Sequence, residues 1–435
     1  MSSTTNERQK SQSPLQVAIA SLVGTTLEWF DFLVYGTMAA LVFPKLFFPS
    51  LDPTAGTLAS FAGLAVGFLA RPIGGVIFGH YGDKVGRKTM LVITLMMMGI
   101  STFAMGLIPT YQQIGIWAPI ILIVLRLVQG LALGGEWGGA ALMAVEHAPA
   151  GKRGRYGSTC QMGSAAGLLL STFVIGLVST LPDEQFLSWG WRLPFLGSVV
   201  LFGFGLIIRL KLVESHVFQD MKKEEAIVKV PIIELFRTQP KNIFIAAGIG
   251  AMNNITFYTV ATFTIAYTTT QLGMDRQPML TNIMIASVFF FFAMLFWGFV
   301  SDHVGRRPLV KLSMVGTAIG AIFYFQIIHT ENLTYIMFAM IGMLFAQTAS
   351  YGPQAAFFSE LFNPQVRYTG ASLGTNIATA LFGGTAPLVA TALMAHFGSP
   401  TPFAIYMVII ACIGFTAVSL TRETVTAEIG LNKHK

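Results

Sequence analysis

The feature that most constrains this chain is a series of long apolar runs that follow one another along most of its length. Twelve of them have roughly 20 residues or more, which as a helix is enough to cross a hydrocarbon core about 30 Å thick. Backbone groups inside lipid must bond to one another, so each run is predicted to be a helix. The sequence therefore predicts an all-α integral membrane protein with twelve transmembrane helices. Their approximate spans are 16–43, 56–79, 88–109, 116–146, 157–181, 191–210, 242–270, 279–300, 308–328, 333–357, 367–394 and 402–421.

Composition agrees with a membrane protein and excludes several other classes. Hydrophobic residues make up 54% of the chain and charged residues only 11%, too few to cover the surface of a soluble domain. The net charge of +7 is not gathered in one basic patch with interleaved aromatic residues, so no nucleic-acid partner is expected. Two cysteines, Cys160 and Cys412, cannot form a disulfide framework, and no Cys/His cluster has the spacing of a metal site.

The distribution of basic residues among the loops orients the chain. With the N-terminus inside, cytoplasmic segments carry 22 of the 27 Lys and Arg residues, whereas outer segments carry only Lys45, Arg192 and Arg276. This positive-inside bias predicts that both termini are cytoplasmic. The longest charged stretch falls midway along the chain and is predicted to be a cytoplasmic linker. The predicted organisation is a tail at 1–15, a six-helix bundle at 16–210, a linker at 211–241, a second bundle at 242–421 and a tail at 422–435.

Two similar loops indicate that one half of the chain repeats the other. Residues 79–88 read Gly-His-Tyr-Gly-Asp-Lys-Val-Gly-Arg-Lys, and residues 298–307 read Gly-Phe-Val-Ser-Asp-His-Val-Gly-Arg-Arg. The two aspartates, Asp83 and Asp302, are 302 − 83 = 219 residues apart, close to half of the 435-residue chain. Two parallel six-helix halves are a transporter architecture, with a binding site expected near the membrane midplane between them.

A second repeat lies at the end of the fourth helix of each half. Glu146 stands seven residues before Arg153, and Glu360 stands seven residues before Arg367. Charge complementarity between these loops predicts a cytoplasmic latch that joins the halves and breaks during a transport cycle. The expected pairs are Asp83 with Arg367, Arg87 with Glu146, Asp302 with Arg155 or Arg153, and Arg306 with Glu360.

Charged residues inside the predicted helices are candidates for function, because a charge at the bilayer centre costs several kcal/mol unless it is paired or hydrated. Glu28, Asp31 and Tyr35 share one face of the first helix, near the midplane. Arg126 lies at a similar depth on the fourth helix, so it is expected to partner one of the carboxylates. A fixed structural ion pair is the alternative to a functional one.

Two further charges, Arg71 and Glu136, lie closer to the cytoplasmic ends of their helices, where structural and functional roles carry equal weight. Gly130, Gly134 and Gly138 recur every four residues and predict close packing of another helix. The second half has polar stripes instead of buried charges, and these serve helix association as often as ligand binding. The stripe residues are Asn254, Tyr258, Gln347, Tyr351, Gln354 and Asn376.

The repeated Gly-x-x-x-Asp-basic-x-Gly-Arg-basic loop, together with Arg-Leu-Val-Gln-Gly at 126–130, resembles the major facilitator superfamily over essentially the whole chain. The second copy departs from that pattern with His303 in place of Lys or Arg. Within the superfamily the chain is similar to the metabolite–proton symporters, and most similar to their shikimate and organic-acid transporters. The motifs that carry this likeness are Leu-Glu-Trp-Phe-Asp-Phe at 27–32, Gly-Phe-Leu-Ala-Arg-Pro-Ile-Gly-Gly at 67–75, Gly-Gly-Glu-Trp-Gly-Gly at 134–139 and Trp-Gly-Trp-Arg-Leu-Pro at 189–194.

The resemblance implies a monomeric carrier in a bacterial inner (plasma) membrane that imports a small organic acid by proton symport, powered by the proton gradient and without a cofactor. A zwitterion such as proline or betaine is an alternative substrate, and uniport or antiport of organic anions is an alternative mechanism. An ATP-driven pump would need Gly-x-x-x-x-Gly-Lys-Ser/Thr, which is absent from the sequence. No enzyme activity is expected. A membrane hydrolase would need a nucleophile beside a base, and the histidines lie mostly at loop edges.

Three sets of residues are candidates for this activity. Proton coupling is assigned to Asp31, with Glu28 and Glu136 as alternatives and Arg126 as the partner. The substrate-binding set is Arg71, Arg126, Tyr35, Gln129, Asn254, Tyr258, Gln347, Tyr351 and Asn376. The gating set is Asp83, Arg87, Glu146, Arg155, Asp302, Arg306, Glu360 and Arg367.

Overall fold

The fold was analysed in a computed structural model, which describes residues 13–214, 218 and 231–426. This part of the chain contains twelve helices that are long and apolar enough to cross a membrane, as the sequence predicted. Most of the two predicted terminal tails, and residues 215–217 and 219–230 of the predicted linker, lie outside the described residues. The last part of the linker forms a short helix, α11 (Pro231–Thr238).

The first half is built from six long helices joined by short ones. The long helices are α1 (Pro14–Leu41), α3 (Pro53–Val85), α4 (Arg87–Leu107), α6 (Trp117–Glu146), α7 (Arg153–Val178) and α9 (Leu193–Leu210). The short helices are α2 (Phe43–Phe47), α5 (Tyr111–Ile114), α8 (Asp183–Ser188) and the 3-10 turn η1 (Gly190–Arg192). Pro72 lies inside α3 without ending it.

The second half repeats the plan with more interruptions. Its helices are α12 (Pro240–Tyr258), α13 (Thr264–Thr270), α14 (Arg276–Val304), α15 (Arg306–Ile328), α16 (Leu333–Tyr351), α17 (Gln354–Leu361), α18 (Arg367–Ala378), α19 (Ala386–Phe397) and α20 (Thr401–Ser419). Two π-helical segments, η2 (Thr259–Phe263) and η4 (Thr379–Gly383), interrupt the seventh and eleventh spans, and the 3-10 turn η3 (Pro364–Val366) precedes α18.

Local features accompany the π-helical segments. Pro387 follows η4 and has no amide proton to donate to the carbonyl of Gly383, four residues before it. In the seventh span the Thr264 hydroxyl donates to the carbonyl of Thr259, five residues back, at 2.8 Å. The sequence predicted single regular helices at 242–270 and 367–394, and the structure corrects both to helices with one widened turn.

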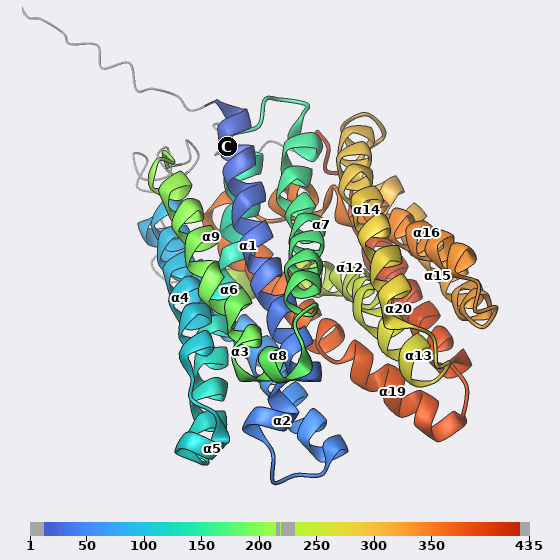
Figure 1. The fold of residues 1–435 in the computed structure, drawn as a ribbon. Coiled ribbons are helices and arrows are strands. Elements are labelled where there is room, and N and C mark those ends of the chain that lie inside the picture. Colours follow the sequence, from blue (N-terminus) through green and yellow to red (C-terminus); the bar gives the residue numbers. More distant parts are fainter. Residues whose placement is uncertain (1–12, 215–217, 219–230, 427–435) are drawn as a thin grey trace, which may run out of the picture.

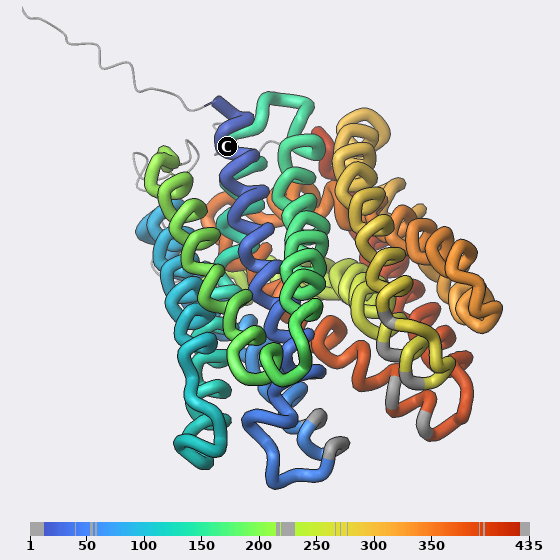
Figure 2. The backbone as a smooth tube through the Cα atoms, in the orientation of Figure 1, coloured from blue at the N-terminus to red at the C-terminus, as the bar shows by residue number. Residues whose placement is uncertain are grey.

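The two halves lie side by side, with the blue-to-green helices of the first half on one side of Figure 1 and the yellow-to-red helices of the second half on the other. The same division can be followed along the backbone trace in Figure 2. They meet mainly through α3 against α18 and α7 against α14. These contacts gather at the end where α1 begins, which is the predicted cytoplasmic end.

Glycines allow these helices to approach backbone to backbone. A side chain at Gly130 would overlap the carbonyl of Gly67, and one at Gly134 would overlap that of Arg71, so α6 packs directly on α3. This confirms the close packing predicted from the glycine spacing. Gly138 instead faces Ser372 of α18 in the other half. Glycines therefore allow close helix packing both within the first half and between the two halves.

Candidate functional site

Asp31 is held by a buried chain of hydrogen bonds between three helices. The Thr102 hydroxyl of α4 donates to its Oδ1 at 2.6 Å, and Gln129 Nε2 of α6 donates to its Oδ2. Gln129 Nε2 also donates to Thr102 Oγ1 at 3.0 Å, and Gln129 Oε1 accepts from Arg126 Nη1. The sequence predicted that Arg126 would partner a carboxylate directly. In the described structure it reaches Asp31 through Gln129.

Arg126 lies against aromatic faces and keeps unused donors. Its guanidinium carbon is 4.3 Å from the ring centre of Tyr35 and 4.7 Å from that of Phe32. The Nε and Nη2 atoms of Arg126 and the Tyr35 hydroxyl are buried without a hydrogen-bond partner in the described structure. Gly63 and Gly67 of α3 leave the room that these groups occupy, since a side chain at Gly67 would lie 2.6 Å from Arg126 Nε. Buried donors of this kind are suited to a ligand carboxylate.

Glu28 and Arg71 form a second, looser pair one turn of α1 away. Arg71 Nη1 lies 3.7 Å from Glu28 Oε1, and the other carboxylate oxygen of Glu28 has no hydrogen-bond partner in the described structure. The Arg71 guanidinium also lies 5.1 Å from the ring centre of Phe32 and 5.2 Å from that of Phe68. Glu28 is therefore much less satisfied than Asp31, although both are buried.

Glu136 is paired with an arginine that the sequence reading did not select. Arg209, in the last turn of α9, forms an ion pair with Glu136 and donates to the Leu91 carbonyl at 2.7 Å. The Thr94 hydroxyl donates to Glu136 Oε2 at 3.0 Å. Arg209 stands at the end of the predicted bundle at 16–210 and was not among the candidate residues. The signal that could have identified it is the need of the buried Glu136 for a cation.

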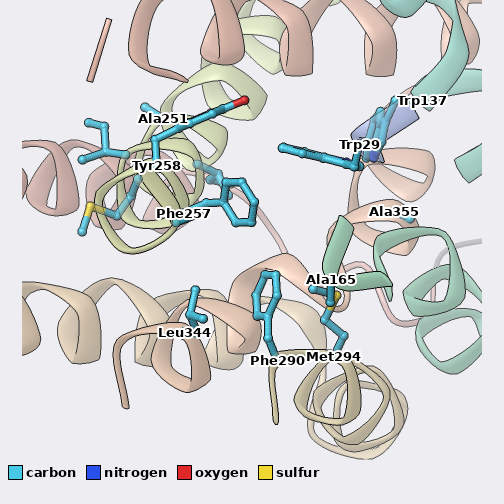
Figure 3. Close-up of a cluster of buried hydrophobic side chains, with 14 of the residues drawn as sticks. Trp29, Trp137, Ala165, Ala251, Phe257, Tyr258, Phe290, Met294, Leu344 and Ala355 are labelled. Carbon is cyan, nitrogen blue, oxygen red and sulfur yellow. The ribbon is translucent and has the colours of Figure 1, made fainter. Parts of the chain in front are cut away.

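Aromatic rings connect this charged cluster to the second half. Tyr258 of α12 lies 5.8 Å from Phe68 and 6.2 Å from Phe32, ring centre to ring centre. Trp29 of α1 lies 4.8 Å from Phe257, and Figure 3 shows Trp29 opposite Phe257 and Tyr258. The Tyr258 hydroxyl is buried without a partner in the part of the chain that is described. Tyr258 is thus the candidate from the second half whose ring contacts Phe32 and Phe68, the two rings that also lie beside Arg71.

The other candidates of the second half have structural partners. Asn376 donates to the Gly134 carbonyl of the first half at 2.7 Å, and Gln347 donates to the Asn253 carbonyl at 2.7 Å. Asn254 donates to the Gly250 carbonyl on its own helix, and the ring of Tyr351 stacks on Phe290. The contacts of Asn376, Gln347 and Tyr351 join different helices, as expected for the role in helix association that was weighed against ligand binding. Gln347 Oε1 remains without a partner among the described residues.

The loops predicted to form a latch lie together between the halves. Arg87 lies 3.4 Å from Glu146, and Arg306 lies 3.3 Å from Glu360, as expected from charge complementarity. Glu146 also has Arg367 of the other half at 3.5 Å, and Glu360 has Arg153 at 3.8 Å. Each glutamate therefore connects an arginine of its own half to one of the opposite half.

The partners predicted for the two aspartates are corrected by the structure. Asp83 accepts hydrogen bonds from the Tyr368 and Thr369 amides and from the Thr369 hydroxyl, at 3.4, 3.1 and 2.8 Å, instead of pairing with the Arg367 guanidinium. Asp302 accepts from the Gly154 and Arg155 amides at 2.7 and 2.9 Å and from Arg306 Nη1 of its own half at 2.9 Å, so the predicted partner Arg155 contributes its backbone and not its guanidinium.

The physical reason is that α18 and α7 begin at these positions. The first amides of a helix lack partners within it, and they carry the positive end of its dipole. A carboxylate from the opposite half is therefore bound by the helix terminus.

Two further glutamates support these loops. Glu214 accepts from the Lys88 amide at 3.1 Å at the start of α4, and Glu423 accepts from the Arg306 and Arg307 amides at 2.8 and 3.1 Å at the start of α15. They occupy matching places after the last helix of each half. Sequence reasoning missed both because they lie outside the repeated loops.

Comparisons with known proteins agree with this geometry. The sequence model of the Major Facilitator Superfamily matches residues 24–383. The Escherichia coli (strain K12) inner membrane metabolite transport protein YhjE is 39% identical over 431 residues, covering 97% of this chain and 98% of the relative. The shikimate transporter of the same strain is 40% identical over 400 residues, covering 90% and 91%.

More distant relatives share the fold. A putative proline/betaine transporter of Staphylococcus aureus (strain COL) is 33% identical, covering 93% of this chain and 87% of the relative. The solved structure of the proton:xylose symporter XylE bound to 6-bromo-6-deoxy-D-glucose is similar with a TM-score of 0.76 at 17% identity, covering 94% of this chain and 96% of the other.

The described residues form twelve helices able to cross a membrane, in two repeated halves, and together with these matches they define a multi-pass membrane transporter and not an enzyme. The chain belongs to the major facilitator superfamily, among the metabolite transporters.

Proposed function

We propose that this protein imports a small organic acid together with protons by alternating access. The observation that carries the proposal is the chain from Asp31 through Gln129 to Arg126, buried near the middle of two transmembrane helices. It places a protonatable carboxyl and an anion-binding guanidinium in one hydrogen-bonded unit. The similarity to a shikimate transporter supports an organic acid as substrate.

The chain provides a physical route for coupling. While Asp31 is charged, its oxygens hold the Gln129 amide, whose own oxygen holds Arg126 Nη1. Protonation of Asp31 weakens its hold on the Gln129 amide, and the guanidinium then has more of its donors available to a substrate carboxylate. Proton and substrate therefore favour the binding of one another, and the coupling must appear in both affinities. Glu28, and after it Glu136, are the alternative proton carriers.

Alternating access is proposed to depend on the contacts between the halves. The carboxylates Asp83 and Asp302, with the ion pairs of Glu146 and Glu360, hold the predicted cytoplasmic side together while the carrier faces outward. Opening toward the cytoplasm must break them.

In this arrangement both termini are cytoplasmic, the membrane is the inner membrane and the carrier works as a monomer. The domain boundaries at 16–210, 211–241 and 242–421 follow the same division.

Uptake of a zwitterion is a second candidate because of the likeness to a proline/betaine transporter. The aromatic rings around Arg71 and Arg126 could contact a quaternary ammonium group. Uniport and antiport of organic anions remain alternatives to symport.

The test compares net uptake with exchange in proteoliposomes loaded with shikimate, using Asp31→Asn. Loss of accumulation driven by a pH gradient, with exchange at equal concentrations retained, is the expected result because exchange needs no net proton movement. Asp275→Asn, an exposed aspartate at the start of α14, is the control. Full proton-driven accumulation in Asp31→Asn would transfer the role to Glu28 or Glu136. If Glu28→Gln and Glu136→Gln are also without effect, symport is excluded.

A further inference from the structure

The buried charges of the first half balance one another. Apart from the residues of the latch, the described structure buries three carboxylates and three arginines, all in this half. Glu136 and Arg209 form a closed pair, which leaves Glu28 and Asp31 with Arg71 and Arg126 at the centre. Because the second half adds no buried charge outside the latch within the described residues, the centre is neutral when both carboxyls are ionised.

Other titratable groups that face these carboxyls or arginines are uncharged near neutral pH. They come from α1, α7, α12 and α16: Tyr35, Cys160, Tyr258 and Tyr351. They therefore do not change the balance. One proton added to Glu28 or Asp31 gives the centre a charge of +1, and one bound monoanion returns it to zero.

Aromatic rings lie beside the two arginines. Phe32, Phe68 and Tyr258 contact one another across the two halves, and both arginines lie over Phe32. A molecule whose carboxylate binds Arg126 must place the rest of its body against these rings, which bury flat or apolar faces well.

We propose, on the basis of the function proposed above, that the site takes a singly charged carboxylic acid with a ring or apolar face, and carries it with one proton in an electroneutral step. Dicarboxylates and zwitterions are then disfavoured. A dianion would leave one unpaired negative charge in the buried centre, and a zwitterion would leave one positive charge, and either is costly in a low dielectric.

The first test measures charge movement. Proteoliposomes containing the full chain are supplied with shikimate, cyclohexane-1,4-dicarboxylate or glycine betaine under an inward pH gradient, and current is recorded beside uptake. Shikimate uptake that depends on the gradient and produces no current is the expected result. Net positive current with betaine as the accumulated substrate, or net negative current with the dicarboxylate, overturns the inference. Two other results overturn the proposed function instead. One is accumulation that does not depend on the pH gradient, and the other is that neither carboxylate is taken up.

The second test measures binding by thermal stabilisation of the purified protein. Shikimate and benzoate should bind at least about tenfold more tightly than the dicarboxylate at the same pH, because the second carboxylate meets no free cation. Equal affinities contradict the charge count. Phe68→Leu should weaken benzoate binding about 2- to 10-fold, whereas Phe403→Leu, whose buried ring lies among Phe263, Phe325 and Tyr406 of the second half, should leave it unchanged. Equal effects of the two substitutions contradict the ring contact.

Discussion

Two tyrosine hydroxyls near the arginines are buried without partners in the described structure, those of Tyr35 and Tyr258. Removing a hydroxyl that bonds nothing within the protein should leave stability unchanged, but should remove a contact that a substrate makes. Tyr258→Phe is therefore expected to weaken substrate binding about 2- to 10-fold without lowering the melting temperature. Thermal stabilisation by shikimate measures both quantities at once.

The matched control is Tyr324→Phe. Its hydroxyl pairs with Thr264 Oγ1 at 2.7 Å, away from the arginines. This substitution should lower the melting temperature and leave the affinity for shikimate unchanged. If Tyr258→Phe behaves in the same way as Tyr324→Phe, its hydroxyl is structural and does not face substrate.

Gly24 of α1 leaves the space into which Arg209 reaches to meet Glu136. A side chain at this position would overlap Arg209 Nη2 and lie 3.1 Å from Glu136 Oε1. Gly24→Ala is expected to destabilise the protein by about 1–3 kcal/mol, because overpacking displaces a buried ion pair. Thermal unfolding in detergent measures the loss.

Gly36→Ala in the same helix is the control, since nothing lies within 4 Å of the added methyl group. There the better helix propensity of alanine should stabilise slightly. A neutral or stabilising effect of Gly24→Ala would show that Arg209 can withdraw without cost.

At the scale of helices, the latch depends on carboxylates that meet helix termini of the opposite half. Asp83→Asn keeps the shape but removes the charge that the α18 terminus attracts. We expect the closed state to lose about 1–2 kcal/mol, which raises the open fraction about 5- to 30-fold. The reporter is Ser372→Cys in a chain lacking Cys160 and Cys412, because Ser372 is fully buried between the halves. Its labelling rate should rise.

Asp183→Asn is the control for this experiment. Asp183 also lies in the first turn of a helix, but α8 is on the predicted outer side and the residue is exposed. Unchanged labelling and unchanged transport in Asp83→Asn would exclude Asp83 from the latch.

At the scale of the whole molecule, the sequence was sufficient for the twelve spans, since segment length and hydropathy determine which helices cross a bilayer. The repeated loops also predicted the pairs Arg87–Glu146 and Arg306–Glu360, because opposite charges at matching depth must neutralise one another. The predicted partners were wrong where an aspartate accepts its hydrogen bonds from backbone amides. A helix terminus attracts an aspartate through its backbone amides, whatever side chains the helix carries. The sequence therefore does not identify the contact.

The other differences between the prediction and the structure concern long side chains. Arg209 was not among the candidates because it stands at the end of an apolar run, yet its stem carries the guanidinium inward to Glu136. Gln129 was expected to bind substrate, and in this structure it joins Asp31 to Arg126. The sequence gives the depth of a residue along its helix, but not which of several neighbours within reach completes its hydrogen bonds.

The widened turns η2 and η4 have a consequence for the relative rates of the steps in a transport cycle. They divide the seventh and eleventh spans, so that the short outer helices α13 and α19 are separated from α12 and α18. Of these two, α18 packs on α3 and α6 of the first half, and α12 packs on α18. Bending of a single short segment is faster than rotation of a six-helix half, typically by orders of magnitude. We therefore expect capture of a molecule from outside to be a rapid, reversible step, and the slower rotation to set the turnover rate.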